Sequence, residues 1–188
     1  MAAIAAAIGG ILYGFFFVIV GNVGVAAALL MIGSLLSSFV LVALSSSVSD
    51  VNEPIARWAL LIGVVGSMLS VAHGGYDLAN VIHTPGASQG DFPNPADPRG
   101  LATFGLTGLA YLVLASLMNR SDKYPPNLGR VGQALGVITI IIFLGRLVIL
   151  DPAHPVVRVA LVLGVAANTV FFLWLGRHWL QRHGSANA

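Results

Sequence analysis

One apolar stretch of the chain carries side chains that could perform acid–base chemistry on a single helical face. His73, Asp77, Asn80 and Thr84 follow the spacing i, i+4, i+7 and i+11, which places them along one stripe of a helix. A histidine one turn before an aspartate suits a general base and the carboxylate that orients it. We therefore predict His73 and Asp77 as candidate catalytic residues, with Asn80 as a candidate ligand-binding residue on the same face.

Two arginines in later apolar stretches lie at the depth of this stripe. Arg146 follows Arg130 by as many residues as His73 follows Arg57, which at about 1.5 Å per helical residue puts both about 24 Å along their helices. Arg158, near the start of the last apolar stretch, reaches a similar level. An arginine fork recognises carboxylate and phosphate groups. The candidate ligand-binding residues are Asn80, Arg99, Arg146, Asp151 and Arg158.

The same charges allow two interpretations. Arg146 and Arg158 could extend to the membrane surface and pair with Asp77 and Asp151, which would anchor the helices without any chemistry. Alternatively, the arginines hold an anion in an outward-facing cavity while His73 and Asp77 exchange a proton, because ionisable groups inside a membrane commonly serve a function. The sequence leaves both interpretations open.

The sequence contains few residues that could bind a metal or a cofactor. It has no cysteine, which excludes disulfides, thiolate chemistry and cysteine-ligated iron–sulfur clusters. His73, His83 and His154 do not show a recognised zinc-ligand spacing, and only His73 lies deep enough to face a haem. Lys123, the single lysine, lies in a polar loop, which excludes a Schiff base inside a span. We therefore expect no metal and no cofactor.

The elements that position these residues must cross a membrane. Of the 188 residues, 57% are hydrophobic and 9% are charged, against about 25% charged residues in a soluble domain. The mean hydropathy is +0.89, so lipid must solvate much of the surface. The net charge of +2 is small, and the basic residues are scattered over the ends of apolar stretches, which disfavours a nucleic-acid partner.

Six stretches are apolar enough for spanning helices of about 20 residues, so we predict an all-α, polytopic transmembrane helix bundle. It forms a single domain over residues 1–183, followed by a disordered tail at 184–188. The first stretch has no basic residue before it, which favours a retained span over a signal peptide. The predicted spans are 3–20, 25–44, 54–80, 100–118, 131–150 and 155–175.

Basic residues near the span ends predict the orientation, because cytoplasmic loops carry the excess of lysine and arginine. One side of the predicted bundle holds six such residues and the other side holds three. We therefore expect both termini in the cytoplasm, the proline-rich loop 84–99 outside, and a multi-pass protein of the plasma (inner) membrane. The six are Arg57, Arg120, Lys123, Arg130, Arg177 and Arg182, and the three are Arg99, Arg146 and Arg158.

Small residues four positions apart let helix backbones approach closely in lipid. They occur in several predicted spans, and we expect them to pack helices inside one bundle rather than to form a dimer face. The lipid bilayer is then the first partner, and other membrane subunits or a second copy of the chain remain candidates. The pairs are Gly10 and Gly14, Ser34 and Ser38, Gly63 and Ser67, and Gly132 and Gly136.

No catalytic motif decides whether the chain is an enzyme, so three function classes remain. The first, which we expect, is a structural or accessory membrane component with an outward-facing layer of histidine, aspartate and arginine. The second is an intramembrane enzyme or binding protein that acts on the anionic head group of a lipid or isoprenoid in the outer leaflet. The third, a small transporter, is disfavoured because the cytoplasmic halves of the spans are almost purely apolar.

Overall fold

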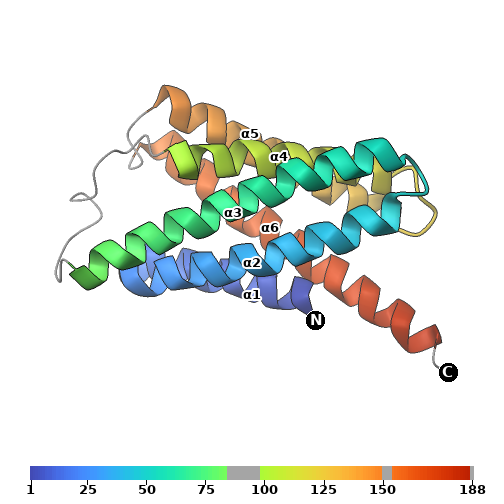
Figure 1. The fold of residues 1–188 in the computed structure, drawn as a ribbon, viewed down its shortest axis with the longest axis horizontal. Helices are drawn as coiled ribbons and strands as arrows, with labels where there is room; N and C mark the ends of the chain where they lie inside the picture. The colour runs from blue at the N-terminus through green and yellow to red at the C-terminus, as the bar shows by residue number, and fades with distance from the viewer. Residues whose placement is uncertain (84–97, 150–153, 187–188) are drawn as a thin grey trace.

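The computed structural model describes residues 1–83, 98–149 and 154–186, and these residues are almost entirely helical. Helix α1 (Ala2–Gly14) runs directly into a π-helical segment, η1 (Phe15–Val20). The described residues thus form an all-α bundle, as the sequence predicts. The remaining helices are α2 (Val23–Val48), α3 (Glu53–His83), α4 (Pro98–Met118), α5 (Pro126–Val148) and α6 (Pro155–Ala186) (Figure 1).

Turn and capping residues set several of the helix boundaries. Gly21 ends η1 in the left-handed conformation, with a φ of 70°, which glycine adopts without steric strain. The side-chain oxygens of Asn22 and Asn52 accept hydrogen bonds from the first turns of α2 and α3, at 3.0 and 3.1 Å. Such caps satisfy N–H groups that have no partner within the helix. Prolines begin α5 and α6, where the missing N–H would be unpaired in any case.

Five helices, α2 to α6, are long and apolar enough to cross a membrane, and α1 is a shorter apolar helix. Together, α1 and η1 cover the first predicted span, 3–20. Helices α3 and α6 extend beyond the predicted spans 54–80 and 155–175, and α6 continues into the predicted tail as far as Ala186. Residues 187–188 of that tail lie outside the described residues.

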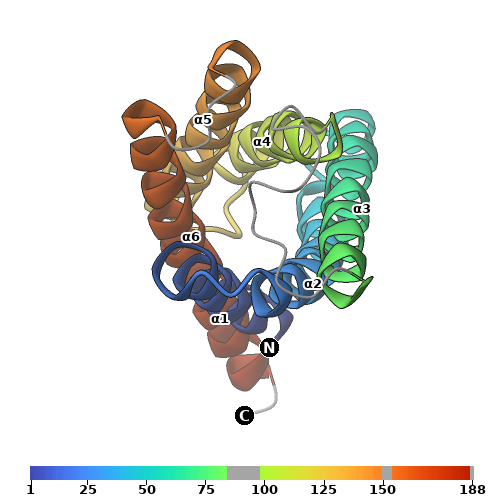
Figure 2. The same ribbon diagram turned by 90° about the vertical axis from the view of Figure 1, so that its left-hand side faces the viewer.

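The six helices close into a ring when viewed along the bundle axis (Figure 2). Each helix packs against its neighbours in the chain, and α6 completes the ring by packing against α1. The helices alternate in direction, so both termini lie toward the end of the bundle that holds the α2–α3 and α4–α5 connections. Because we expect the termini to be cytoplasmic, we call this end of the bundle the inner end. The opposite end, where α3 and α5 finish, is the outer end.

The largest buried side chains fill the inner half of the ring. Phe171 and Phe172 of α6 pack edge to face at a centroid distance of 5.5 Å, and Tyr111 of α4 lies 5.9 Å from Phe172. Leu44 of α2 and Leu114 of α4 are fully buried in the same cluster. The inner half therefore has a solid apolar core, and this core fixes the positions of all the helices that carry the candidate site.

Glycines bring two helix backbones into close contact. A Cβ atom at Gly136 of α5 would lie 2.7 Å from the Leu112 nitrogen and 2.8 Å from the Gly108 oxygen, both in the backbone of α4. At Gly132 a Cβ atom would lie 2.8 Å from the Cβ of Ala115. Small residues at these positions permit the close approach of α4 and α5. This predicted glycine pair therefore packs helices inside the bundle.

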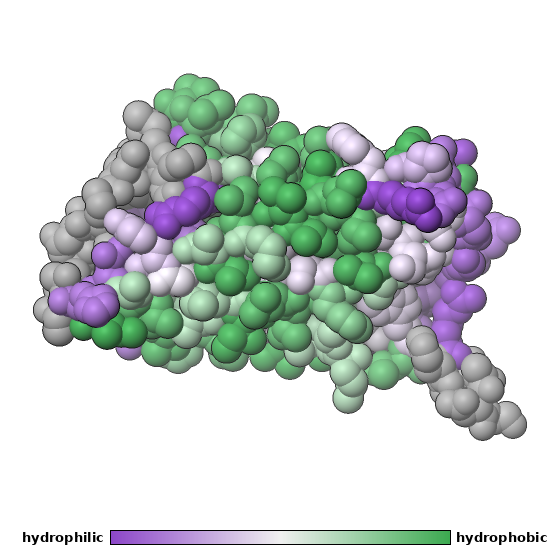
Figure 3. Space-filling view, viewed as in Figure 1, coloured by the Kyte–Doolittle hydropathy of each residue, from purple (hydrophilic) through white to green (hydrophobic). Residues whose placement is uncertain are grey.

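The face of the bundle that Figure 3 shows has an apolar belt between two more polar ends. Leu61, Phe39 and Val162 expose 67%, 62% and 60% of their surface. A soluble protein rarely exposes a large continuous apolar area, whereas the lipid interior accepts one. The chain is therefore a multi-pass membrane protein.

Candidate functional site

Helices α3, α4 and α5 carry polar side chains to the outer end of the ring. His73, Asp77 and Asn80 lie in the last three turns of α3, Arg99 lies in the first turn of α4, and Arg146 lies in the last turn of α5. These elements adjoin because α4 packs between α3 and α5. We call these five residues the outer polar layer.

His73 and Asp77 lie next to each other on α3. The Nε2 atom of His73 is 3.5 Å from Oδ2 of Asp77, and the two side chains are 24% and 18% exposed. The His73 ring also packs against Gly100 of α4, where a Cβ atom would lie 3.6 Å from the imidazole. Because Gly100 has no side chain, the imidazole can lie directly on α4. A titratable ring is thus held beside a carboxylate at the α3–α4 contact, a geometry suited to proton exchange.

Aromatic rings lie against the two arginines of the layer. The guanidinium carbon of Arg99 is 4.1 Å from the centroid of the Tyr76 ring, and that of Arg146 is 5.8 Å from the centroid of the Phe104 ring. Both arginines are partly buried. Cation–π attraction of this kind is worth about 0.5–2 kcal/mol, and a stacked guanidinium donates its hydrogen bonds within its own plane. The layer therefore contains two oriented cations.

Tyr13 of α1 belongs beside this layer, although the sequence analysis did not select it. Its hydroxyl lies within electrostatic range of both Arg146 and Asp77, so charges from α5 and α3 act on one point of α1. Tyr13 lies about two turns before the Gly21 bend, which is the depth of the layer. The count of helical rise that selected Arg146 could have found Tyr13 as well.

The remaining predicted site residues have different surroundings. The side-chain nitrogen of Asn80 is buried without a hydrogen-bond partner among the described residues. Arg158 is exposed on α6, which packs against α5 and α1 rather than against α3. Asp151 and loop 84–97 lie outside the described residues, so an ion pair between Asp151 and an arginine stays a prediction.

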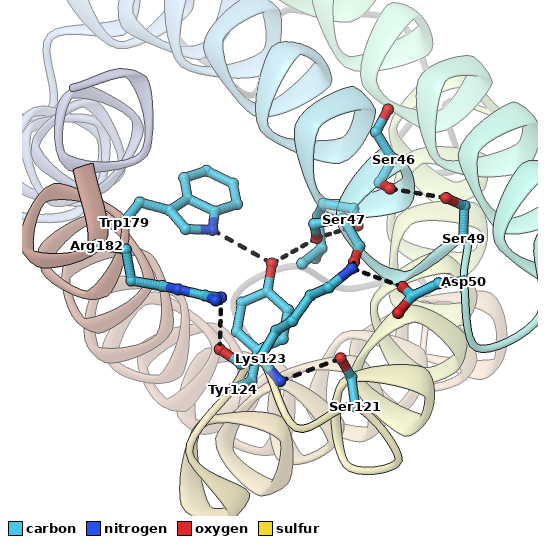
Figure 4. Close-up of polar contacts among 10 residues, drawn as sticks. Ser46, Ser47, Ser49, Asp50, Ser121, Lys123, Tyr124, Trp179 and Arg182 are labelled. Atoms are coloured by element: carbon cyan, nitrogen blue, oxygen red, sulfur yellow. Dashed lines mark hydrogen bonds and ion pairs between the residues drawn. The ribbon is translucent and has the colours of Figure 1, made fainter. Parts of the chain in front are cut away.

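A second polar network lies at the inner end of the bundle (Figure 4). The Lys123 ammonium group donates hydrogen bonds to the Asp50 carboxylate at 2.8 Å and to the Ser47 carbonyl at 3.0 Å. The Lys123 carbonyl accepts hydrogen bonds from Arg182 at 3.0 Å and from His178 at 2.9 Å. This Lys123 network joins the end of α2, the α4–α5 connection and the end of α6.

Tyr124 is the buried centre of the Lys123 network, with 6% of its surface exposed. Its hydroxyl lies 2.5 Å from the Ser47 hydroxyl and accepts a hydrogen bond from the Trp179 indole at 3.3 Å. The sequence indicated only a basic loop here. Ser47 and Trp179 lie 77 and 55 positions from Tyr124, and no periodic pattern links residues so far apart.

The Lys123 network also changes the titration of Asp50. The hydrogen bond from Lys123 holds the pKa of the exposed Asp50 carboxyl below its ordinary value, because a nearby cation favours the charged form of a carboxylate. The ion pair between α2 and the α4–α5 connection is therefore intact throughout the neutral pH range.

Two hollows that the described residues line include no residue of the outer polar layer. A groove of about 590 Å³ runs along α6 at the inner end, and a smaller hollow of about 130 Å³ lies between α1, α2 and α6. A cavity at the outer polar layer, below loop 84–97, stays a prediction. Within the described ranges, no group of three histidine or carboxylate side chains could hold a metal ion. The groove is lined by Pro125, Val170, Leu173, Trp174, Arg177, His178 and Gln181.

Comparison of the chain with protein-family models, curated proteins and solved structures finds no match. The chemistry of the outer polar layer is therefore the basis for assigning a function.

Proposed function

We propose that the protein is an accessory membrane component whose outer polar layer holds the anionic head group of a lipid or isoprenoid. The observation that carries this proposal is the position of His73, Arg99 and Arg146 at the outer ends of three adjacent helices. Charge-assisted hydrogen bonds from arginine to phosphate are roughly twice as strong as neutral ones. They are stronger still at a partly buried site, where water screens them less.

The charge distribution supports a site in the outer leaflet. Six basic residues lie toward the inner end and three toward the outer end, so the inner end is expected to face the cytoplasm. With this orientation, both termini are cytoplasmic and the outer polar layer is at the level of the external head groups. The membrane would be the plasma (inner) membrane.

The packing of the inner half disfavours a transporter. A transport path needs polar groups or a constriction that opens through the whole membrane. Phe171, Phe172, Leu44 and Leu114 instead fill the ring below the outer polar layer. A ligand at the layer would therefore be held rather than passed to the other side.

An enzyme that acts on the same head group is the second candidate, and the His73–Asp77 pair is the observation that favours it. His73 would transfer a proton and Asp77 would orient the imidazole. Release of inorganic phosphate from an isoprenoid diphosphate by the wild-type protein, but not by His73→Gln, would support this candidate. Equal release by both proteins would contradict it.

Lipid binding by the purified chain tests the first candidate. Native mass spectrometry of the wild-type protein with phosphatidylglycerol should show one tightly bound lipid per chain, with a clear preference over phosphatidylcholine. Arg146→Gln should weaken this binding about tenfold, which corresponds to the loss of about 1.4 kcal/mol. The matched control is Arg130→Gln on the same helix, because Arg130 is exposed at the inner end; its affinity should equal that of the wild type.

Two results would contradict the proposal. In the first, Arg146→Gln lowers the melting temperature and leaves lipid affinity unchanged, which would make the outer polar layer a structural anchor. In the second, Arg146→Gln and Arg130→Gln weaken lipid binding equally, which would show nonspecific attraction between basic residues and anionic lipid.

A further inference from the structure

A hollow between three helices is lined by small, apolar and polar side chains. It has a volume of about 130 Å³ and lies between α1, α2 and α6. Its lining residues extend from Ala6 to Tyr13 in α1 and from Leu29 to Ser37 in α2, with Asn168 in α6. We call it the central hollow. The residues that line it are Ala6, Gly9, Gly10 and Tyr13 of α1, Leu29, Leu30, Gly33, Ser34 and Ser37 of α2, and Asn168 of α6.

The glycines create this space. A Cβ atom added at Gly33 would meet nothing within 4 Å, so the space beside it is empty of protein atoms. A Cβ atom at Gly10 would lie 3.0 Å from the Asn168 side-chain nitrogen, so glycine at this position lets the amide approach α1. Larger residues at Gly10 or Gly33 would fill the hollow.

Two polar side chains of the central hollow have no hydrogen bond within the described part of the chain. Ser34 already bonds with the Ser70 hydroxyl, and Ser37 donates to the Gly33 carbonyl, each at 2.8 Å. Neither the Tyr13 hydroxyl nor the Asn168 amide has such a partner. Polar groups inside a membrane are costly when they remain unpaired. A bound molecule that supplies hydrogen-bonding oxygens would remove this cost.

We infer that the central hollow binds a lipid-soluble molecule whose head is uncharged, ring-sized and bears a hydrogen-bonding oxygen, as a quinone head does. No charged side chain lines the hollow, so a neutral head is favoured over an anion. Its volume is close to that of a cavity of about 150 Å³ that accommodates benzene. The Asn168 amide and the Tyr13 hydroxyl donate hydrogen bonds to the oxygens of the head.

Water is the alternative occupant. At about 30 Å³ per molecule, the hollow could hold a few waters bonded to Tyr13 and Asn168. A hollow that holds only water would not bind a lipid-soluble probe with an apolar ring. The inference does not rest on the proposed anionic site, because the outer polar layer uses charged residues and the central hollow uses none.

Binding of a short-chain quinone tests the inference. The full chain is placed in phosphatidylcholine nanodiscs, and a tritium-labelled benzoquinone with one isoprene unit is titrated, with empty nanodiscs as the background. The wild-type protein should show one saturable site per chain. Gly33→Leu, which fills the open space, and Asn168→Leu, which removes the amide, should each weaken binding at least tenfold. The matched control Thr169→Val changes a neighbouring residue that does not line the hollow, and it should bind as the wild type does.

Tyr13→Phe keeps the test decisive if a larger substitution prevents folding. It removes one oxygen atom and should weaken binding about fivefold, as expected for one lost hydrogen bond. Absence of saturable binding by the wild type would overturn the inference and leave water as the occupant. Unchanged affinity in Tyr13→Phe, or in a folded Gly33→Leu protein, would also overturn it, because the quinone would then lie elsewhere.

Discussion

At the residue scale, the two ends of the bundle stabilise their charges in different ways. At the inner end, the Lys123 network directs its donors to Asp50 and to backbone carbonyls. At the outer end, Arg99 and Arg146 lie over aromatic rings, and His73 lies beside Asp77. A stacked guanidinium retains the planar fork that matches a phosphate. We therefore place the proposed anionic ligand at the outer end.

Replacement of Asp50 with asparagine should change the pH dependence of stability. Folding lowers the pKa of Asp50, so its bond with Lys123 stabilises the fold above the ordinary aspartate pKa of about 4. This stabilisation is lost as the pH falls through the lowered pKa of the folded state. The melting temperature of the wild type should exceed that of Asp50→Asn near neutral pH, and the two should converge in acid below about pH 4. Thermal unfolding in detergent over a pH series measures both, and a constant difference throughout the acidic range would contradict the assignment.

Tyr124→Phe should destabilise the bundle through its inner end. The substitution removes the hydroxyl that contacts both the Ser47 hydroxyl and the Trp179 indole, and each lost hydrogen bond costs about 0.5–1.5 kcal/mol. Tyr76→Phe is the matched control, because Tyr76 is exposed and its ring, rather than its hydroxyl, contacts Arg99. The melting temperature should fall clearly for Tyr124→Phe and little for Tyr76→Phe. Equal shifts would show that the Lys123 network adds no stability.

The sequence could predict part of the candidate site because helical rise converts position into depth. His73, Asp77 and Arg146 share a level for this reason, and the i, i+4 spacing brings the first two within 3.5 Å. Rise does not give direction around the ring, so depth alone could not show that Arg158 is exposed on α6. The aromatic partners of the arginines depend on helix rotation, which charge patterns do not report.

At the scale of the elements, the sequence predicts some helix starts well and others poorly. The predicted spans 54–80 and 155–175 begin within one residue of α3 and α6, whereas the predicted span 131–150 begins five residues after Pro126, the first residue of α5. The end of α6 was placed too early because apolar content falls after residue 175. Hydrogen bonds from His178 and Arg182 to the Lys123 carbonyl hold this last part of α6. Such tertiary bonds leave no mark in local hydropathy.

The contact between α4 and α5 should depend on the absence of a side chain at Gly136. Gly136→Ala would place a Cβ atom 2.7 Å from the Leu112 backbone nitrogen, and overpacking of this kind costs about 1–3 kcal/mol. Gly145→Ala on the same helix is the matched control, since nothing lies within 4 Å of its Cβ position. Thermal unfolding should show a lower melting temperature for Gly136→Ala only. A protein with Gly136→Ala that is as stable as the wild type would contradict the close approach of the two backbones.

At the scale of the whole molecule, the two halves of the bundle differ. The ring is solid in its inner half, and its outer half carries the outer polar layer, which fits a protein that holds a ligand at one face of the membrane. Composition predicts the membrane class and the all-α fold, because lipid must solvate so apolar a chain. The closure of α6 onto α1 could not be predicted, since hydropathy does not specify which helices are neighbours.

Accessibility of position 73 tests most directly whether the outer polar layer opens outward to receive an anionic head group. The chain has no cysteine, so His73→Cys introduces a single reactive thiol, and a membrane-impermeant maleimide can be added to intact cells. We predict labelling from outside that short-chain phosphatidylglycerol slows. Arg120→Cys at the inner end should react only after permeabilisation, and Leu114→Cys in the core should not react. Failure of His73→Cys to react from outside, or reaction only from the cytoplasmic side, would contradict an outward-facing anion site.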